Sequence, residues 1–162
     1  MAKKSYTVGQ VNGYIKNLID KYQIPMELFQ LEITETTENA ESLSYINSLK
    51  QAGFTLLMDD FGSGYSSLCM LKNTPFDVLK MDRQFLDECL DSKQGETIIS
   101  HVISMSNDLG LSIIAEGVEN RGTADFLYDN GCSVSQGFYF SKPVSIPEFE
   151  RMLDEQQTEQ QR

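Results

Sequence analysis

The sequence alternates between two hydrophobic patterns, one with helical spacing and one typical of short buried strands. The expected helices cover residues 8–22, 37–51, 66–72, 96–109, 123–128 and 145–153, and residues 85–90 are helical or irregular. The expected strands cover residues 28–33, 54–59, 77–82, 111–115 and 132–140. Repeated alternation of this kind predicts an α/β fold with a parallel sheet and crossover helices.

Length and composition indicate one globular domain. The chain has 162 residues, of which 40% are hydrophobic and 23% are charged, and this suffices for a hydrophobic core. We expect one domain over residues 1–153 and a polar, Gln-rich tail over residues 154–162. The sequence has no apolar run of about 18 residues and no signal-like segment after its start, so we expect no membrane segment and a cytoplasmic protein.

The charge balance restricts the partners and metals of this chain. A formal net charge of -11 argues against binding to a nucleic-acid duplex or an anionic membrane, because phosphate binding needs clusters of Lys and Arg. His101 is the only histidine, and the three cysteines match no zinc or redox spacing. A metal site would therefore use oxygen ligands, which favours Mg²⁺, Mn²⁺ or Ca²⁺.

Polar side chains stand at the end of each expected strand. They are Glu32 with Thr34, Asp59 with Asp60, Lys80 with Asp82, Glu116 with Glu119, and Gln136. Parallel α/β proteins carry their chemistry at the carboxyl ends of the strands, so we expect these groups to share one edge of the sheet. Carboxylates gathered at one edge repel one another unless cations lie among them.

Each of these groups also has a purely structural interpretation. The two adjacent aspartates precede a glycine-containing loop and are also typical of a solvated turn. Lys80 and Asp82 lie two residues apart and face the same side of a strand, so they are also compatible with a structural ion pair. The two glutamates after the fourth strand are compatible with a helix start. The functional interpretation depends on their occurrence together at successive strand ends.

Two-metal hydrolysis of a phosphodiester is the chemistry that uses such a cluster. Two divalent cations that share a carboxylate produce hydroxide from water and neutralise the attacked phosphate. A lysine near that water orients it or stabilises the developing charge. The negative net charge then does not exclude an anionic substrate, because the metal ions reverse the local charge.

Two architectures are compatible with the alternation. A doubly wound sheet, as in receiver domains, also gathers acidic residues and a lysine at its strand ends. That fold begins with a strand and carries its acidic pair there, whereas this chain begins with a helix and has Asp59 and Asp60 on its second strand. The other architecture is part of a (β/α)₈ barrel, of which this length holds about five of eight units.

Five segments contain these strand ends, in the order LEITE at 31–35, MDDFGSGYSSL at 58–68, LKMD at 79–82, IAEGVEN at 114–120 and SQGFYFSKP at 135–143. They resemble successive motifs of the EAL domain, the bacterial phosphodiesterase family that hydrolyses cyclic di-GMP. The resemblance covers about residues 14–153. It implies a partial (β/α)₈ TIM-like barrel of EAL type with about five of eight strands.

The resemblance also implies a role for each matching residue. The implied metal ligands, for two Mg²⁺ or Mn²⁺ ions, are Glu32, Asp59 as the bridge, Asp60 and Glu116. The implied catalytic residues are Lys80, which would hold the nucleophilic water, Asp82, which would support it, and Glu116. Positioning of substrate or of the glycine loop is implied for Glu35, Glu119 and Gln136. The implied reaction is hydrolysis of cyclic di-GMP to linear pGpG.

The sequence departs from the EAL pattern at its beginning. The early strands of the family carry a Glu-Ala-Leu motif and later an Asn at a strand end, both ligands of the first metal; this sequence has no such motif before Glu32, and Asn12 lies in an expected helix. We therefore expect an N-terminally truncated barrel with an incomplete first metal site and little activity in isolation. Its exposed sheet edges would be covered by an EAL-type homodimer or another partner. The alternative function is a non-catalytic module that binds cyclic di-GMP or docks a partner.

Overall fold

The structure, a computed structural model, describes residues 8–34, 40–62 and 67–160. Within these residues one sheet contains β1 (Gln30–Ile33), β2 (Thr55–Phe61), β3 (Val78–Met81), β4 (Ser112–Ala115) and β5 (Val134–Ser135). Each strand pairs in parallel with the next, in sequence order. A doubly wound sheet reverses its strand order, so the receiver-like alternative is wrong. The order is that of a barrel segment, and the described strands do not close it.

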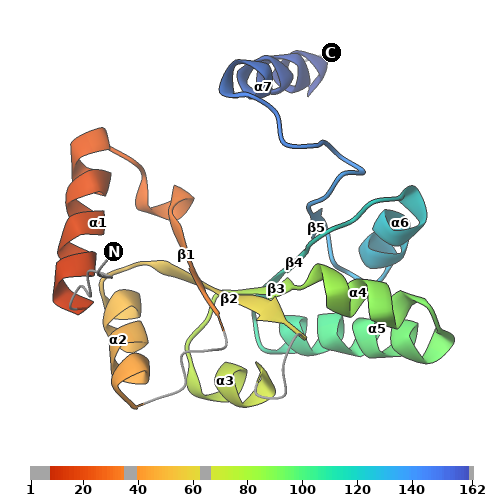
Figure 1. Cartoon of the computed structure of the whole chain (residues 1–162), viewed down its shortest axis with the longest axis horizontal. Coiled ribbons are helices and arrows are strands. Elements are labelled where there is room, and N and C mark those ends of the chain that lie inside the picture. The colour runs from red at the N-terminus through yellow and green to blue at the C-terminus, as the bar shows by residue number, and fades with distance from the viewer. Residues whose placement is uncertain (1–7, 35–39, 63–66, 161–162) are drawn as a thin grey trace, which may run out of the picture.

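Helices connect successive strands, others precede β1, and the final helix follows β5 and stands apart from the sheet (Figure 1). They are α1 (Val8–Tyr22), the 3₁₀ helix η1 (Met26–Leu28), α2 (Ala40–Gln51), α3 (Ser67–Asn73), α4 (Arg83–Leu90), α5 (Lys93–Asp108), α6 (Arg121–Asp129) and α7 (Ile146–Gln160). In the view of Figure 1, α2, α3 and α5 lie below the sheet. No helix of the described segments is long and apolar enough to cross a membrane.

The core is formed by alternate residues of the central strands and by the helices packed on them. Its most deeply buried members include Leu56, Met58, Leu79, Met81, Ile99, Ile103 and Leu127. Successive side chains of a strand point to opposite faces, so Val78 and Lys80 share the face opposite to Leu79 and Met81. β3 is buried along its whole length, and Lys80 is its one charged residue.

The pairing of β2 with β3 is irregular where the two aspartates lie. The pairs on either side of the irregularity are Met58 with Leu79 and Phe61 with Met81. β2 therefore advances three residues (58 to 61) while β3 advances two (79 to 81), and Asp59 and Asp60 share the position opposite Lys80. This is a β-bulge, which redirects side chains next to many functional sites. Asp60 has a φ of 57°, in the left-handed region.

The last strand is shorter than the sequence predicts. The expected strand at 132–140 is reduced to the two residues of β5. After β5 the backbone N–H groups of Phe140 and Ser141 donate to the Gly137 carbonyl, which turns the chain away from the sheet. The local apolar pattern does not predict this turn, because the turn depends on the packing of Gly137 against a segment distant in sequence.

The final helix is longer than predicted. The sequence places its end near residue 153, and the structure continues it to Gln160. Arg151 pairs with Glu148 at 2.7 Å and with Glu155 at 3.1 Å on the same helix face. Such pairs stabilise an exposed helix beyond its apolar positions. The expected polar tail is therefore helical over residues 154–160, and α7 stands apart from the sheet (Figure 1).

Candidate functional site

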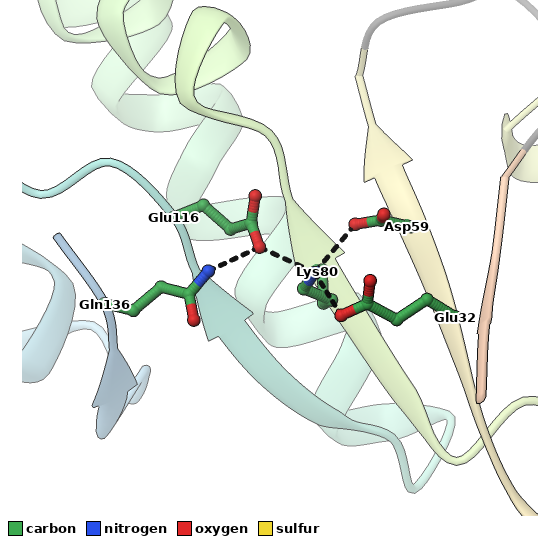
Figure 2. A network of polar contacts seen from close by, with 5 residues as sticks. All are labelled: Glu32, Asp59, Lys80, Glu116 and Gln136. Atoms are coloured by element: carbon green, nitrogen blue, oxygen red, sulfur yellow. Dashed lines mark hydrogen bonds and ion pairs between the residues drawn. The ribbon is translucent and has the colours of Figure 1, made fainter. Parts of the chain in front are cut away.

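Three carboxylates converge on one ammonium group at the carboxyl edge of the sheet (Figure 2). Lys80 Nζ donates to Glu32 Oε1 at 2.6 Å and to Asp59 Oδ1 at 2.9 Å. It also lies 2.7 Å from Glu116 Oε1. These residues come from β1, β2, β3 and the position after β4, so adjacent parallel strands assemble the cluster. The structure thus brings four of the predicted site residues together, and we call them the Lys80 cluster.

Lys80 is held in place by its strand. β3 is paired on both sides, and the Lys80 side chain is 8% exposed. Burial alone would lower the pKa of Lys80, but its hydrogen bonds to Glu116, Glu32 and Asp59 outweigh burial and raise the pKa above its usual range. Lys80 therefore carries a positive charge at neutral pH.

The β-bulge places the two aspartates in different surroundings. Asp59 points toward Lys80 (Figure 2), and its side chain is 17% exposed. Burial raises the pKa of Asp60, the nearby charges of Asp59, Asp82 and Glu32 raise it further, and Lys80 acts in the opposite direction. Asp60 therefore lies in negative surroundings that favour a cation.

The segments after β4 and β5 support Glu116. Gln136 Nε2 donates to Glu116 Oε1 at 2.6 Å (Figure 2). The backbone N–H of Gln136 donates to the Ala115 carbonyl at 2.8 Å, and that of Val118 donates to the Gln136 carbonyl at 3.0 Å. A Cβ at Gly137 would lie 2.2 Å from the Val118 carbonyl oxygen, so only glycine permits this approach. The predicted residue Gln136 therefore belongs beside the Lys80 cluster.

Other predicted residues lie outside the cluster. Asp82 accepts a hydrogen bond at 2.8 Å from the Gln84 backbone N–H and is the N-cap of α4. β3 ends at Met81, so Asp82 lies one residue beyond the strand in which the sequence placed it beside Lys80. Glu119 forms an exposed ion pair with Arg83 at 2.7 Å. The predicted residue Glu35 lies outside the described residues.

A cavity of about 660 Å³ adjoins the cluster at Glu116 and Gln136. Its lining also contains residues that the sequence analysis missed, namely Arg83, Lys142, Phe138, Val144, Ile146 and Phe149. Arg83 directly follows the strand expected at residues 77–82, and this position was a usable signal. The apolar lining residues could not be identified from the sequence, because their position depends on the course of the chain between β5 and α7.

The cluster suits a hard cation by the chemistry of its donors. Carboxylate oxygens are the ligands that Mg²⁺ and Mn²⁺ prefer. Over residues 8–34, 40–62 and 67–160, no three His, Cys, Asp or Glu side chains form a ready-made metal site. The Lys80 ammonium instead occupies the point where Glu32, Asp59 and Glu116 meet, as a stand-in cation. The carboxylate ligands are therefore of the type that binds such a metal, and in this structure the Lys80 ammonium lies between them.

Comparison with known proteins gives a consistent family match. The sequence matches the EAL domain family over residues 3–143. It is 40% identical over 145 residues to the signaling protein YkoW of Bacillus subtilis, covering 88% of this chain and 18% of YkoW. It is 36% identical over 138 residues to the cyclic di-GMP phosphodiesterase RocR of Pseudomonas aeruginosa, covering 83% of this chain and 35% of RocR. The chain thus spans about a fifth to a third of the length of these relatives.

Solved structures agree with this match. The EAL enzyme Bd1971, in its cAMP and cyclic-di-GMP bound form, is 30% identical with a TM-score of 0.80, covering 86% of this chain and 38% of that one. BlrP1 of Klebsiella pneumoniae, in a manganese and cyclic di-GMP complex, is 30% identical with a TM-score of 0.75, covering 82% of this chain and 34% of that one. Both likenesses cover more than four fifths of this chain.

Proposed function

Because this chain belongs to the EAL domain family, we propose that it carries the lysine and carboxylate part of a cyclic di-GMP phosphodiesterase site. Its fold is a five-stranded part of the TIM-like barrel of EAL domains. The observation that carries the proposal is the convergence of Glu32, Asp59 and Glu116 on Lys80 at the carboxyl edge of the sheet. The proposal is also supported by the similarity of this chain to RocR, which is a cyclic di-GMP phosphodiesterase.

The proposed reaction is hydrolysis of cyclic di-GMP to pGpG. The oxygen of a water molecule joins phosphorus, the bond to a 3′ oxygen breaks, and a proton reaches that departing oxygen. Mg²⁺ or Mn²⁺ supplies Lewis acidity and an activated water when bound, and the proposed ligands are Glu32, Asp59, Asp60 and Glu116. Lys80 donates a hydrogen bond to the attacking water and stabilises the negative charge that develops.

The remaining residues have positioning roles in this proposal. Gln136 orients Glu116 through their 2.6 Å hydrogen bond. Glu119 orients Arg83 at the cavity, where a guanidinium suits a phosphate and apolar walls suit a base. Asp82 acts through the start of α4, and Glu35 is assigned to the glycine loop from the family pattern alone.

We further propose that the chain in isolation hydrolyses cyclic di-GMP very weakly. All three N–H donors of Lys80 are directed to carboxylates, which leaves none for a water molecule. The described residues also form no ready-made metal site. The same observations favour the second candidate function, a module that binds cyclic di-GMP or docks a partner without catalysis.

A hydrolysis assay tests the level and place of activity. The purified chain is incubated with cyclic di-GMP and Mn²⁺ or Mg²⁺, and pGpG is separated by ion-pair chromatography. We expect slow or no conversion, and any conversion should be lost in Glu116→Ala and kept in Glu150→Ala, whose residue is exposed on α7. Robust turnover would contradict weak activity, and turnover that survives Glu116→Ala would contradict the assigned site.

Calorimetry separates the two candidate functions. We expect heat of binding when cyclic di-GMP is added in the presence of Mn²⁺, and a weaker signal for Glu116→Ala. Cyclic GMP is the control ligand, because it carries one base and one phosphate. Binding without hydrolysis would favour the non-catalytic module. Absence of binding to cyclic di-GMP would refute both nucleotide functions and leave partner docking.

A further inference from the structure

The Lys80 ammonium is saturated by its surroundings. A lysine side chain has three N–H donors and no acceptor. Lys80 Nζ lies 2.6 Å from Glu32 Oε1, 2.9 Å from Asp59 Oδ1 and 2.7 Å from Glu116 Oε1, one carboxylate for each donor. Its side chain is 8% exposed, so water contributes little. All three donors of this group are therefore used within the cluster, where its single positive charge offsets one of the three negative charges.

The oxygens that hold the ammonium belong to the residues proposed above as metal ligands. Each carboxylate has a second oxygen, but a divalent cation at the point where the three carboxylates meet would lie against the ammonium, whose positive charge repels it. Two of the three carboxylates are mostly buried, at 17% exposure for Asp59 and 21% for Glu116, and Gln136 holds Glu116 in place. The cation and the ammonium therefore compete for one position.

We propose that Lys80 is the internal counter-ion of the metal-free site, and that a divalent cation binds by displacing its ammonium from the three carboxylates. Lys80 then sets the metal affinity of the site. The displaced ammonium regains free N–H donors, which links metal binding to the availability of Lys80 for water. This inference rests on the proposed function, because that function supplies the metal.

Removal of the lysine has opposite effects on the two states of the site. In the metal-free protein, loss of the ammonium leaves three carboxylates facing one another, and their repulsion raises the free energy of that state. In the metal-bound protein the divalent cation offsets two of the three negative charges, so the loss matters less. The difference between the two states appears as tighter metal binding.

Titration of the protein with Mn²⁺ in the absence of nucleotide tests the proposal. We expect Lys80→Met to bind Mn²⁺ about tenfold more tightly than the unaltered chain, within the usual range of coupling between sites. We expect the metal-free Lys80→Met protein to melt at a lower temperature than the unaltered chain. Addition of Mn²⁺ should raise the melting temperature of the variant by more than that of the unaltered chain. Equal or weaker Mn²⁺ binding by Lys80→Met would overturn the proposal.

Lys50→Met is the matched control. Lys50 is also paired with a carboxylate, that of Asp77, at a position outside the Lys80 cluster. This variant makes the same side-chain change as Lys80→Met and removes the same charge. Because Lys50 lies outside the Lys80 cluster, we expect it to leave Mn²⁺ affinity unchanged. An equal gain in affinity for Lys50→Met would show that net charge, and not displacement, is responsible, and would overturn the proposal.

A measurement on the unaltered protein covers the case in which Lys80→Met does not fold. The ammonium groups of Lys80 and Lys50 are followed by ¹⁵N-resolved NMR during addition of Mg²⁺, with Lys80→Arg used for assignment. We expect the Lys80 signal to shift and its hydrogens to exchange faster with water, while the Lys50 signal stays constant. A Lys80 signal that is unchanged at saturating Mg²⁺, or absence of Mg²⁺ binding, would overturn the proposal.

The outcome is separable from that of the proposed function. These titrations contain no nucleotide, and the calorimetry with cyclic di-GMP is a separate measurement. Displacement of Lys80 by metal without any affinity for cyclic di-GMP would refute the proposed function alone. Affinity for cyclic di-GMP with no effect of Lys80 on metal binding would refute the counter-ion role alone.

Discussion

Asp77, which directly precedes β3, forms an ion pair with α2 and hydrogen bonds with β2 and β4. Lys50, near the end of α2, donates to Asp77 Oδ1, and the backbone N–H of Leu56 in β2 donates to Oδ2 at 2.9 Å. The backbone of Asp77 bonds to Leu56 on one side and to Ser112 on the other, each at 2.9 Å. Asp77 directly precedes β3, so these bonds fix where Lys80 falls relative to the neighbouring strands.

Substitution of Asp77 should therefore cost more than substitution of its charged partner. Asp77→Ala leaves the buried N–H of Leu56 without its side-chain acceptor, and we expect a loss of about 1–3 kcal/mol in the free energy of unfolding. Lys50→Met removes only a half-exposed ion pair, and we expect a loss below about 1 kcal/mol. Urea unfolding at constant pH measures both. Equal effects of the two variants would contradict the role assigned to the backbone bond.

At the scale of elements, the junction of β3 and α4 determines how one predicted site residue is used. Asp82 has an extended backbone, with φ −65° and ψ 145°, and its side chain accepts from Gln84 N–H. Asn120, between β4 and α6, caps α6 in a similar way by accepting from the Thr123 N–H. A polar side chain between a strand and a helix can therefore serve as a helix cap. The sequence alone does not distinguish this role from a functional one, because both place a polar residue at the end of a strand.

Two substitutions of Asp82 separate capping from charge. Asn is as good an N-cap as Asp, whereas Ala cannot accept the hydrogen bond, so Asp82→Ala should be less stable than Asp82→Asn by about 0.5–2 kcal/mol. Both variants remove one of the negative charges that, after burial and Asp59, raise the pKa of Asp60. Thermal unfolding of the two proteins side by side gives the comparison. If they prove equally stable, the cap contributes nothing and the charge of Asp82 is its main property.

At the scale of the whole molecule, the sheet has two open edges and an uncovered apolar region. β1 and β5 each pair with one neighbour among the described strands. Several large apolar side chains between β5 and the middle of α7 are exposed, including Phe138, Phe140, Ile146 and Phe149. Exposed edges and apolar patches of this kind promote association.

We expect the purified chain to self-associate in a concentration-dependent manner. The double variant Ile146→Ser, Phe149→Ser should reduce association without lowering the free energy of unfolding, because both side chains are more than half exposed. Leu109→Ser is the control, since Leu109 is equally exposed at the end of α5. Sedimentation velocity over a range of concentrations measures the change. A monomer at every concentration, or an equal reduction by Leu109→Ser, would contradict this prediction.

Most elements could be predicted because hydrophobic periodicity is a local property. The helices and parallel strands of residues 8–34, 40–62 and 67–131 lie within a few residues of their expected bounds. The two large differences come from contacts outside the pattern. β5 ends early where Gly137 packs against Val118, and α7 continues because Arg151 pairs along an exposed helix.

The sequence by itself determined which chemical groups stand at the strand ends, because strand length and residue type are local. The tertiary structure decided which of those groups meet. Pairing of β2 with β3 creates the bulge that turns Asp59 toward Lys80, and the end of β3 turns Asp82 away into a helix cap. The first outcome depends on the register between strands distant in sequence, which no local pattern contains, and the second depends on where β3 ends and α4 begins. The same register leaves Lys80 as the cation at the centre of its carboxylates.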